Sequence, residues 1–359
     1  MASAVNPRFI SEIERLGAFD IQACYSCGNC TAICPLSDEA HSFPRRMIRY
    51  SVLGLEEKAL GSPDLWLCYY CGQCTDTCPR EADPGSLMMA LRRYATRRYS
   101  LGRVADIFYS GFASTIAWTV LTLAAIVGMV TIFREPHPNL QKVDLFSFIN
   151  LGYLHIAGLI MAAVIFFFAL VQLGIMARSV TRGKQLKGKW IGSFFRVLFN
   201  EVFIQRKFNQ CEEKQRYIAH LCLLWGFLGL LLVTLLLFAV DLAHLPDFVR
   251  IIARVIGVPA GLALLYGSGF YIWRRRAIKD AYSKYTHHSD WVFAVSLFLV
   301  GLTGFLTVLF HVAHLPWPTY IMFIIHLVVA FDLLLAAPFT KFAHAIYRPL
   351  AIWLSEVWG

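Results

Sequence analysis

Eight of the ten cysteines stand in two runs that share one spacing. The first run is Cys24-x2-Cys27-x2-Cys30-x3-Cys34-Pro35, and the second is Cys68-x2-Cys71-x2-Cys74-x3-Cys78-Pro79. In this pattern three closely spaced thiolates bind three corners of one [4Fe–4S] cubane, and the fourth cysteine of the run binds the other cluster. The spacing therefore predicts two clusters. One is expected on Cys24, Cys27, Cys30 and Cys78, and the other on Cys34, Cys68, Cys71 and Cys74.

Zinc sites and disulfide bonds are the alternatives for these cysteines. Zinc sites also use Cys-x2-Cys pairs, but two complete runs that each end in proline favour iron–sulfur clusters. A disulfide framework requires an oxidising compartment and usually a signal peptide. The first twenty residues are polar, without an apolar core ahead of a cleavage site. Cys211 and Cys222, outside the runs, are expected to be free thiols.

The segment between the two runs indicates the type of cluster domain. Thirty-three residues separate Cys34 from Cys68, and residues 45–54 and 56–60 are predicted to be helical. A compact β-rich ferredoxin usually has a shorter spacer. The sequence therefore predicts an α-helical ferredoxin-like domain.

Several histidines lie in apolar segments of the second half of the chain. A histidine inside a membrane span is costly and is a candidate functional residue, and paired histidines on facing helices are typical axial ligands of haem. His326 and His344 are eighteen residues apart, or five turns of one helix at 3.6 residues per turn, so they would share a face about 27 Å apart. This separation predicts two b haems stacked across a bilayer.

Each haem needs a second ligand at a matching depth. His220 is assigned to the inner haem together with His344, and His155 to the outer haem together with His326. His311 and His314 compete with His155 for the outer position.

The composition requires a bilayer around much of this chain. Hydrophobic residues make up 57% of the 359 residues and charged residues only 16%, with a mean hydropathy of +0.56. Ordinary soluble domains carry about 25% charged residues. The sequence predicts an all-α protein with a double-cluster domain at 1–103 and a transmembrane cytochrome b domain at 104–359. Six spans are long enough to cross a core of about 30 Å, at about 105–133, 150–177, 217–240, 248–273, 290–313 and 319–344.

The net charge of +10 is unevenly distributed over the loops. Arginines and lysines gather before the first span, between spans two and three, and after span four, whereas the other loops are nearly neutral. This alternation is the positive-inside pattern, which predicts a multi-pass protein of the inner membrane with both termini and the iron–sulfur domain in the cytoplasm. It explains the basic charge by contact with membrane lipid, and no nucleic acid is expected as a partner. Residues 191–202 form an apolar helical stripe, predicted to be an interfacial helix or a docking surface for a partner protein.

Both halves of the chain resemble known families. Residues 1–100 resemble the C subunit of heterodisulfide reductases, which carries the same doubled cysteine motif. Residues 210–350 resemble the cytochrome b family that contains the gamma subunit of respiratory nitrate reductase and the E subunit of heterodisulfide reductases. The run from His326 to His344, HLVVAFDLLLAAPFTKFAH, carries most of the second resemblance. It implies that these two histidines bind different b haems and that His220, followed by Gly226-Phe227, is the partner on the inner haem.

One position departs from the nitrate reductase family. That family has a further haem ligand ten residues after the histidine that matches His220, and here the position is Leu230. The outer haem must therefore recruit another ligand, for which His155 is the candidate, or be absent.

A fusion of these two halves is similar to the membrane subunits of quinone-interacting membrane-bound oxidoreductases of sulfate reducers. The resemblance implies a redox relay in which menaquinol is oxidised to menaquinone. Electrons would then pass to flavin-containing, heterodisulfide reductase A-like subunits, and on to adenylylsulfate (APS) reductase. A heterodisulfide reductase fusion, a component of the sulfite-reduction membrane complex, and a membrane anchor with structural cofactors are the alternatives.

Overall fold

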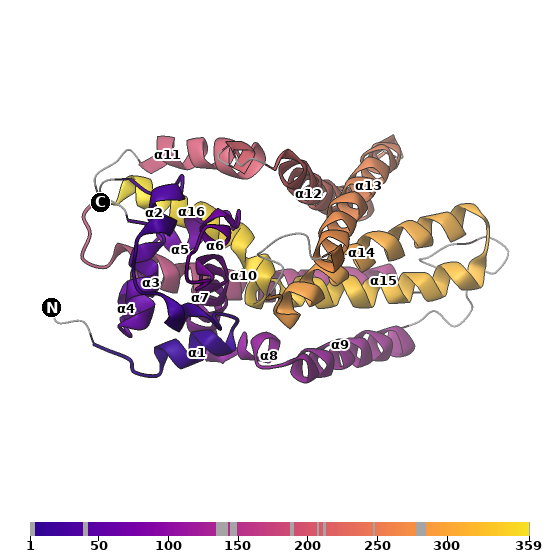
Figure 1. Ribbon diagram of the computed structural model, residues 1–359. Coiled ribbons are helices and arrows are strands. Elements are labelled where there is room, and N and C mark those ends of the chain that lie inside the picture. Colours follow the sequence, from indigo (N-terminus) through magenta and orange to yellow (C-terminus); the bar gives the residue numbers. More distant parts are fainter. Residues whose placement is uncertain are drawn as a thin grey trace.

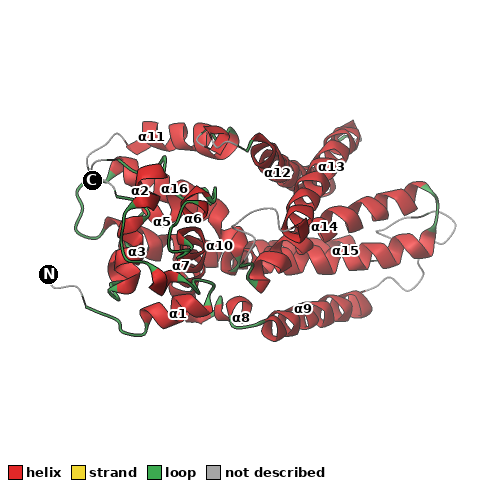
Figure 2. Ribbon diagram, in the orientation of Figure 1, coloured by secondary structure: helices red, strands yellow, loops and turns green. Residues whose placement is uncertain are grey.

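The computed structural model describes residues 4–38, 42–133, 143, 149–186, 190–206, 208–210, 213–246, 248–277 and 285–358. Within these residues the protein is helical and has no strand, which confirms the predicted all-α class (Figure 2). Seven short helices form the N-terminal domain: α1 (Phe9–Arg15), α2 (Asn29–Ile33), α3 (Arg45–Val52), α4 (Glu56–Leu60), α5 (Asp64–Leu67), α6 (Gln73–Asp76) and α7 (Pro84–Tyr99). The predicted helices between the cysteine runs correspond to α3 and α4.

Helix α7 is the central element of the N-terminal domain. Asp83 caps its first turn by accepting a hydrogen bond from the Ser86 amide at 3.0 Å, and Pro84 occupies the first position, where no amide donor is needed. The side chains of Leu87, Met88 and Leu91 are fully buried against the surrounding short helices. This packing fixes the cysteine loops, which carry few apolar residues of their own.

Six helices are long and apolar enough to cross a membrane, in agreement with the predicted number. They are α9 (Phe112–Phe133), α10 (Leu151–Thr181), α12 (Lys214–Ala243), α13 (Phe248–Ala277), α14 (His288–Val312) and α15 (Pro316–Ala336). The first begins at Phe112 rather than near 105, because a separate short helix, α8 (Asp106–Tyr109), precedes it. Figure 1 shows α14 and α15 side by side, extending away from the N-terminal domain.

Helices α12 and α13 cross at very short range. A Cβ atom added to Gly226 would lie 2.6 Å from the amide nitrogen of Leu264, and one added to Gly267 would lie 2.6 Å from the carbonyl oxygen of Ala219. Small residues allow the backbones of membrane helices to approach closely in this way. The crossing therefore fixes the start of α12, where His220 lies, against the end of α13.

The expectation that His326 and His344 share one uninterrupted helix is wrong. Helix α15 ends at Ala336, two short turns follow at Ala337–Phe339 and Lys341–Ala343, and Thr340 between them is extended. Pro338 explains the break, because proline lacks an amide donor and clashes with the preceding turn of a helix. His344 instead begins a new helix, α16 (His344–Val357).

Helix α16 packs against the N-terminal domain rather than continuing across the membrane (Figure 1). The ring of Tyr347 lies 4.7 Å from that of Trp66 and 5.7 Å from that of Tyr99, measured between centroids. All three side chains are buried in one core that also contains residues of α10 and α15. The N-terminal domain and the near ends of the membrane helices therefore share a hydrophobic core.

Helix α11 (Trp190–Val197) contains most of the predicted apolar stripe. Ile191, Phe194 and Phe195 are exposed, whereas Val197 is buried. The helix lies along the outside of α16, where the indole of Trp353 donates to the Trp190 carbonyl oxygen at 2.9 Å. Its exposed face is compatible with either a lipid surface or a partner protein.

Candidate redox centres

The two cysteine runs have the same local backbone. Gly28 and Gly72 precede α2 and α6 with φ values of 91° and 90°, in the left-handed region that favours glycine. Earlier in each run the amides of Ser26 and Tyr70 donate to the sulfurs of Cys24 and Cys68, at 3.4 Å and 3.3 Å. The repeated turn folds the first three cysteines of each run into the same kind of loop.

Four of the predicted ligands surround one cavity of about 310 Å³. Its wall contains Cys24, Cys27 and Cys30 of the first run together with Cys78 of the second. The side chain of Asn29 donates to the Thr77 carbonyl oxygen at 2.5 Å and holds the two runs together. This grouping is the crossed set that the spacing predicts.

The other four cysteines also lie together. Burial raises the pKa of Cys34 to about 11, and the neighbouring thiolates of Cys68 and Cys71 contribute to the rise. Burial likewise raises the pKa of Cys74, again with contributions from the other three sulfurs. Cys34, from the first run, therefore sits among the cysteines of the second.

These two groups suit clusters better than single metal ions. Among the described residues, no three Cys, His, Asp or Glu side chains lie close enough to share one ion. In a cubane each cysteine thiolate binds a different iron atom, so the four cysteine sulfurs need not lie as close together as the ligands of a single ion. Gathering several buried thiolates is unfavourable unless cations compensate their charge, and iron supplies that charge. Cys222 is a free thiol, as expected, and Cys211 lies outside the described residues.

A layer of arginines separates the Cys68 loop from the membrane helices. Arg92 of α7 donates to the carbonyl oxygen of Cys68 at 2.5 Å, and Arg348 of α16 donates to the same oxygen at 3.0 Å. Arg216, near the start of α12, donates to the carbonyl oxygen of Tyr70 at 3.0 Å. Burial raises the pKa of Cys68, whereas Arg92 and Arg348 oppose this rise. The arginines thus stabilise negative charge at this cysteine group.

His220 and His344 face each other next to this layer. Their ring centroids are 6.2 Å apart. Metal–imidazole bonds of about 2 Å would place two rings that share one metal roughly 6 Å apart between centroids. The Nδ1 atom of His220 lies 2.8 Å from Oε1 of Gln205, and that of His344 lies 2.6 Å from the Lys341 carbonyl oxygen.

These hydrogen bonds define the tautomer of both rings. Both partners are acceptors, so each Nδ1 carries the proton and donates it, and each Nε2 keeps a lone pair for a metal. Burial also lowers the pKa of His344 to about 4, which keeps its ring neutral near pH 7. The pair therefore fits axial ligation of a haem iron.

The predicted outer ligands are arranged differently. His326 Nδ1 lies 3.0 Å from the Thr303 hydroxyl, which itself donates to the Leu299 carbonyl oxygen at 2.7 Å, so the imidazole is the donor. His155 lies beside Asp241, at 3.8 Å, and its ring is 4.7 Å from that of Phe238. The described residues show no ring contact between His155 and His326, and the Nδ1 of His311 is buried without a partner among them. The second outer ligand stays a prediction.

The structure also brings together residues that the sequence did not single out. Asp290, at the start of α14, accepts from Arg93 of α7 at 2.6 Å and from Lys341 at 2.8 Å. This buried ion-pair network joins the N-terminal domain to the membrane helices. Asp332 of α15 lies inside a membrane-length helix, and a carboxylate in an otherwise apolar span is a signal that could have marked it.

Comparisons with known proteins agree with the cysteine geometry. Residues 20–82 match the model of the 4Fe-4S dicluster domain family. A heterodisulfide reductase C-subunit-like protein of Archaeoglobus profundus is 36% identical over 94 residues, which is 26% of this chain. The chain spans half the length of that relative. No solved structure matches the chain.

The protein is therefore an iron–sulfur membrane protein with a [4Fe–4S] dicluster domain and six membrane-length helices.

Proposed function

We propose that the chain is the membrane component of a menaquinol-oxidising complex. In this proposal His220 and His344 hold an inner haem b, His155 and His326 hold an outer haem b, and the eight cysteines hold two [4Fe–4S] clusters in the two crossed sets. Each of these groups accepts and releases one electron at a time. Electrons from menaquinol would leave through flavin-containing, heterodisulfide reductase A-like subunits and reach APS reductase.

One observation carries the relay. Arg348 stands one turn after His344 on α16 and donates to the carbonyl oxygen of Cys68 at 3.0 Å. A single side chain thus links the helix of the inner haem pair to the second cysteine group. Cys34 also lies near Cys30, which brings the second group close to the first. These contacts support a relay in which the two cysteine groups and the inner histidine pair are neighbours.

The basic residues support an orientation with the clusters in the cytoplasm. Arg216 at the start of α12 donates to the Tyr70 carbonyl oxygen of the N-terminal domain at 3.0 Å. Arg275 at the end of α13 lies 3.9 Å from Asp290, which pairs with Arg93 of that domain. Arginines near membrane helices are enriched on the cytoplasmic side. In the proposal both termini also lie on the cytoplasmic side, and the membrane is the inner membrane.

A heterodisulfide reductase-type complex is the second candidate, because the archaeal relative is a heterodisulfide reductase C-subunit-like protein. Both candidates use the same relay and differ in the soluble partner. Co-purification of the partner proteins from the native membrane separates them.

The test uses the purified complex and menadiol, a soluble menaquinol analogue. Two b haems and about eight cluster irons per chain are expected, from two cubanes of four irons each. Menadiol should reduce the haems, which is followed by their absorbance bands. It should then reduce the clusters, whose reduced form gives a signal in electron paramagnetic resonance. His220→Ala should remove one haem and stop reduction of the clusters.

His244→Asn is the matched control for this variant. His244 is exposed at the far end of the same helix and has a positive φ of 49°, which asparagine tolerates. It should keep both haems and normal cluster reduction. A complex without b-type absorbance, or one whose haems stay oxidised with menadiol, would rule the proposal out.

A further inference from the structure

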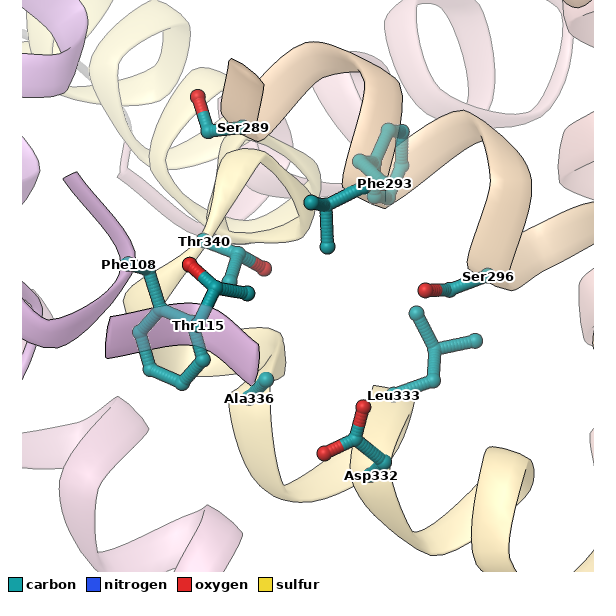
Figure 3. A pocket seen from close by; sticks show the side chains of 10 residues that line it. Phe108, Thr115, Ser289, Phe293, Ser296, Asp332, Leu333, Ala336 and Thr340 are labelled. Atoms are coloured by element: carbon teal, nitrogen blue, oxygen red, sulfur yellow. The ribbon is translucent and has the colours of Figure 1, made fainter. Parts of the chain in front are cut away.

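A cavity lies where α9, α14 and α15 meet near the N-terminal domain, with about 400 Å³ of empty space that includes its opening to the outside. Its walls combine apolar side chains with hydroxyl groups and one carboxylate. Its lining includes Thr115, Phe293, Ser296, Asp332, Leu333 and Thr340. Figure 3 shows Asp332 and Ser296 on separate helices, both turned towards the open middle of the cavity.

Asp332 supplies the carboxylate in the cavity wall. Its Oδ2 accepts a hydrogen bond from Thr119 at 3.1 Å. Its Oδ1 is buried and lacks a donor with full hydrogen-bond geometry among the described residues, and the side chains of Thr122 and Trp118 approach the carboxylate as further hydrogen-bond donors. A buried acceptor without a donor is costly, and an ionisable group inside a membrane span is a functional candidate. A ligand hydroxyl in the cavity would add a donor to this carboxylate.

The cavity also lies beside the inner histidine pair. Phe293 forms part of its wall, and the Phe293 ring is 6.5 Å from the ring of His344, between centroids. A ligand here would therefore be separated from the inner haem position by one aromatic side chain. The wall requires a largely apolar ligand with a hydroxyl donor, which can enter from a bilayer.

We propose that this cavity binds the head group of menaquinol and that Asp332 accepts the proton of one of its hydroxyls. The proposal rests on the proposed function, which supplies the redox centres. Menaquinol becomes menaquinone by losing two protons and two electrons. Asp332 takes one proton as that O–H bond breaks, and the second proton goes to water. The electrons leave one at a time to one-electron acceptors of the haem and iron–sulfur class.

The test measures binding as well as reduction. The purified complex is titrated with 2-heptyl-4-hydroxyquinoline N-oxide, a menaquinol analogue whose fluorescence is quenched when it binds. Asp332→Asn keeps the size of the side chain and removes its charge, and Ser296→Leu fills the cavity from the opposite wall. Thr131→Val is the control, because Thr131 is exposed on α9 and its hydroxyl donates only to Gly128 of its own helix, at 2.9 Å.

Asp332→Asn should raise the Kd of the analogue at least tenfold, and Ser296→Leu should abolish saturable quenching. Thr131→Val should bind as the wild type does. The haem and iron contents establish that each variant is assembled. If one cavity variant does not fold, the Kd of the other variant decides the test. Wild-type Kd values in both cavity variants, together with normal menadiol reduction, would overturn this site and leave the proposed function standing. A wild-type complex that neither binds the analogue nor is reduced would overturn both.

Discussion

Gly267→Ala tests whether the crossing of α12 and α13 positions His220. The new Cβ atom would lie 2.6 Å from the Ala219 carbonyl oxygen, whereas ordinary van der Waals contact begins near 3.4 Å. The two helices must therefore separate by about 0.8 Å at the residue next to His220, because the opposing atom belongs to the backbone and cannot rotate away. Overpacking of this kind costs about 1–3 kcal/mol. The separation also disturbs the 6.2 Å spacing between the rings of His220 and His344.

The expected result is a selective loss of one haem. A weakening of 1.4 kcal/mol corresponds to about tenfold in affinity, so the inner haem should become substoichiometric while cluster iron is unchanged. Haem content is measured by the pyridine haemochrome assay, and iron content by the absorbance of an iron–chelator complex. Gly261→Ala is the control on the same helix, since a Cβ atom there meets nothing within 4 Å. If Gly267→Ala retained full haem and the same redox spectrum as Gly261→Ala, this crossing would have no role in positioning His220.

Three further predictions concern the clusters and the contact between the two halves. Cys34→Ser should remove the cluster of the second run and Cys78→Ser that of the first, each lowering cluster iron from about eight to about four atoms. Electron paramagnetic resonance identifies the cluster lost, and loss of the first run's cluster in Cys34→Ser with loss of the second run's cluster in Cys78→Ser would contradict the crossed assignment. Asp290→Ala leaves the 8%-exposed Arg93 side chain without its carboxylate and should lower the unfolding free energy by about 3–5 kcal/mol. Arg196→Ala breaks an exposed pair and should change this free energy by at most about 1 kcal/mol in denaturant titrations. Equal effects of the two variants would refute the role of burial. Burial lowers the pKa of His287 from 6.5 to about 3, so the unfolded chain takes up a proton before the folded one and stability falls as the pH drops from 6.5 towards 3. His287→Asn keeps an acceptor at the helix cap and should lose less stability than the wild type over this range in thermal melts. Parallel pH profiles of the two proteins would disprove the account.

The cysteine groups could be predicted because their geometry is local and repeated. Each run has a fixed spacing and a glycine at the position of positive φ, so the first three sulfurs are arranged by their own loop. The exchange of the fourth cysteine is a property of the doubled motif. The six membrane-length helices were equally accessible, since length and hydropathy suffice to identify them.

The relation between the haem candidates could not be obtained in the same way. Periodicity alone favours one long helix through His326 and His344, and it ignores the single proline that ends α15. Pairing of His155 with another histidine depends on how α10 packs, and the lipid-facing residues that dominate this helix do not specify its neighbours. Asp290 and Arg93 are almost two hundred residues apart in the chain, and no local pattern joins them.

The break after α15 has a consequence for the proposed electron path. A straight continuation would have kept His344 and the residues after it on the axis of α15. Because the chain turns at 337–343, His344 starts a helix that lies along the N-terminal domain, and Arg348 follows one turn later against the Cys68 carbonyl oxygen. The same helix buries Tyr347 against Trp66, which lies just before the second cysteine run. The side chains at the start of α16 thus fix the spacing between the histidine pair and the cluster loop, which electron transfer between them requires. Arg348→Leu should therefore alter the midpoint potential of the second cluster while both haems stay bound, and unchanged potentials in a redox titration would show that Arg348 supports packing alone.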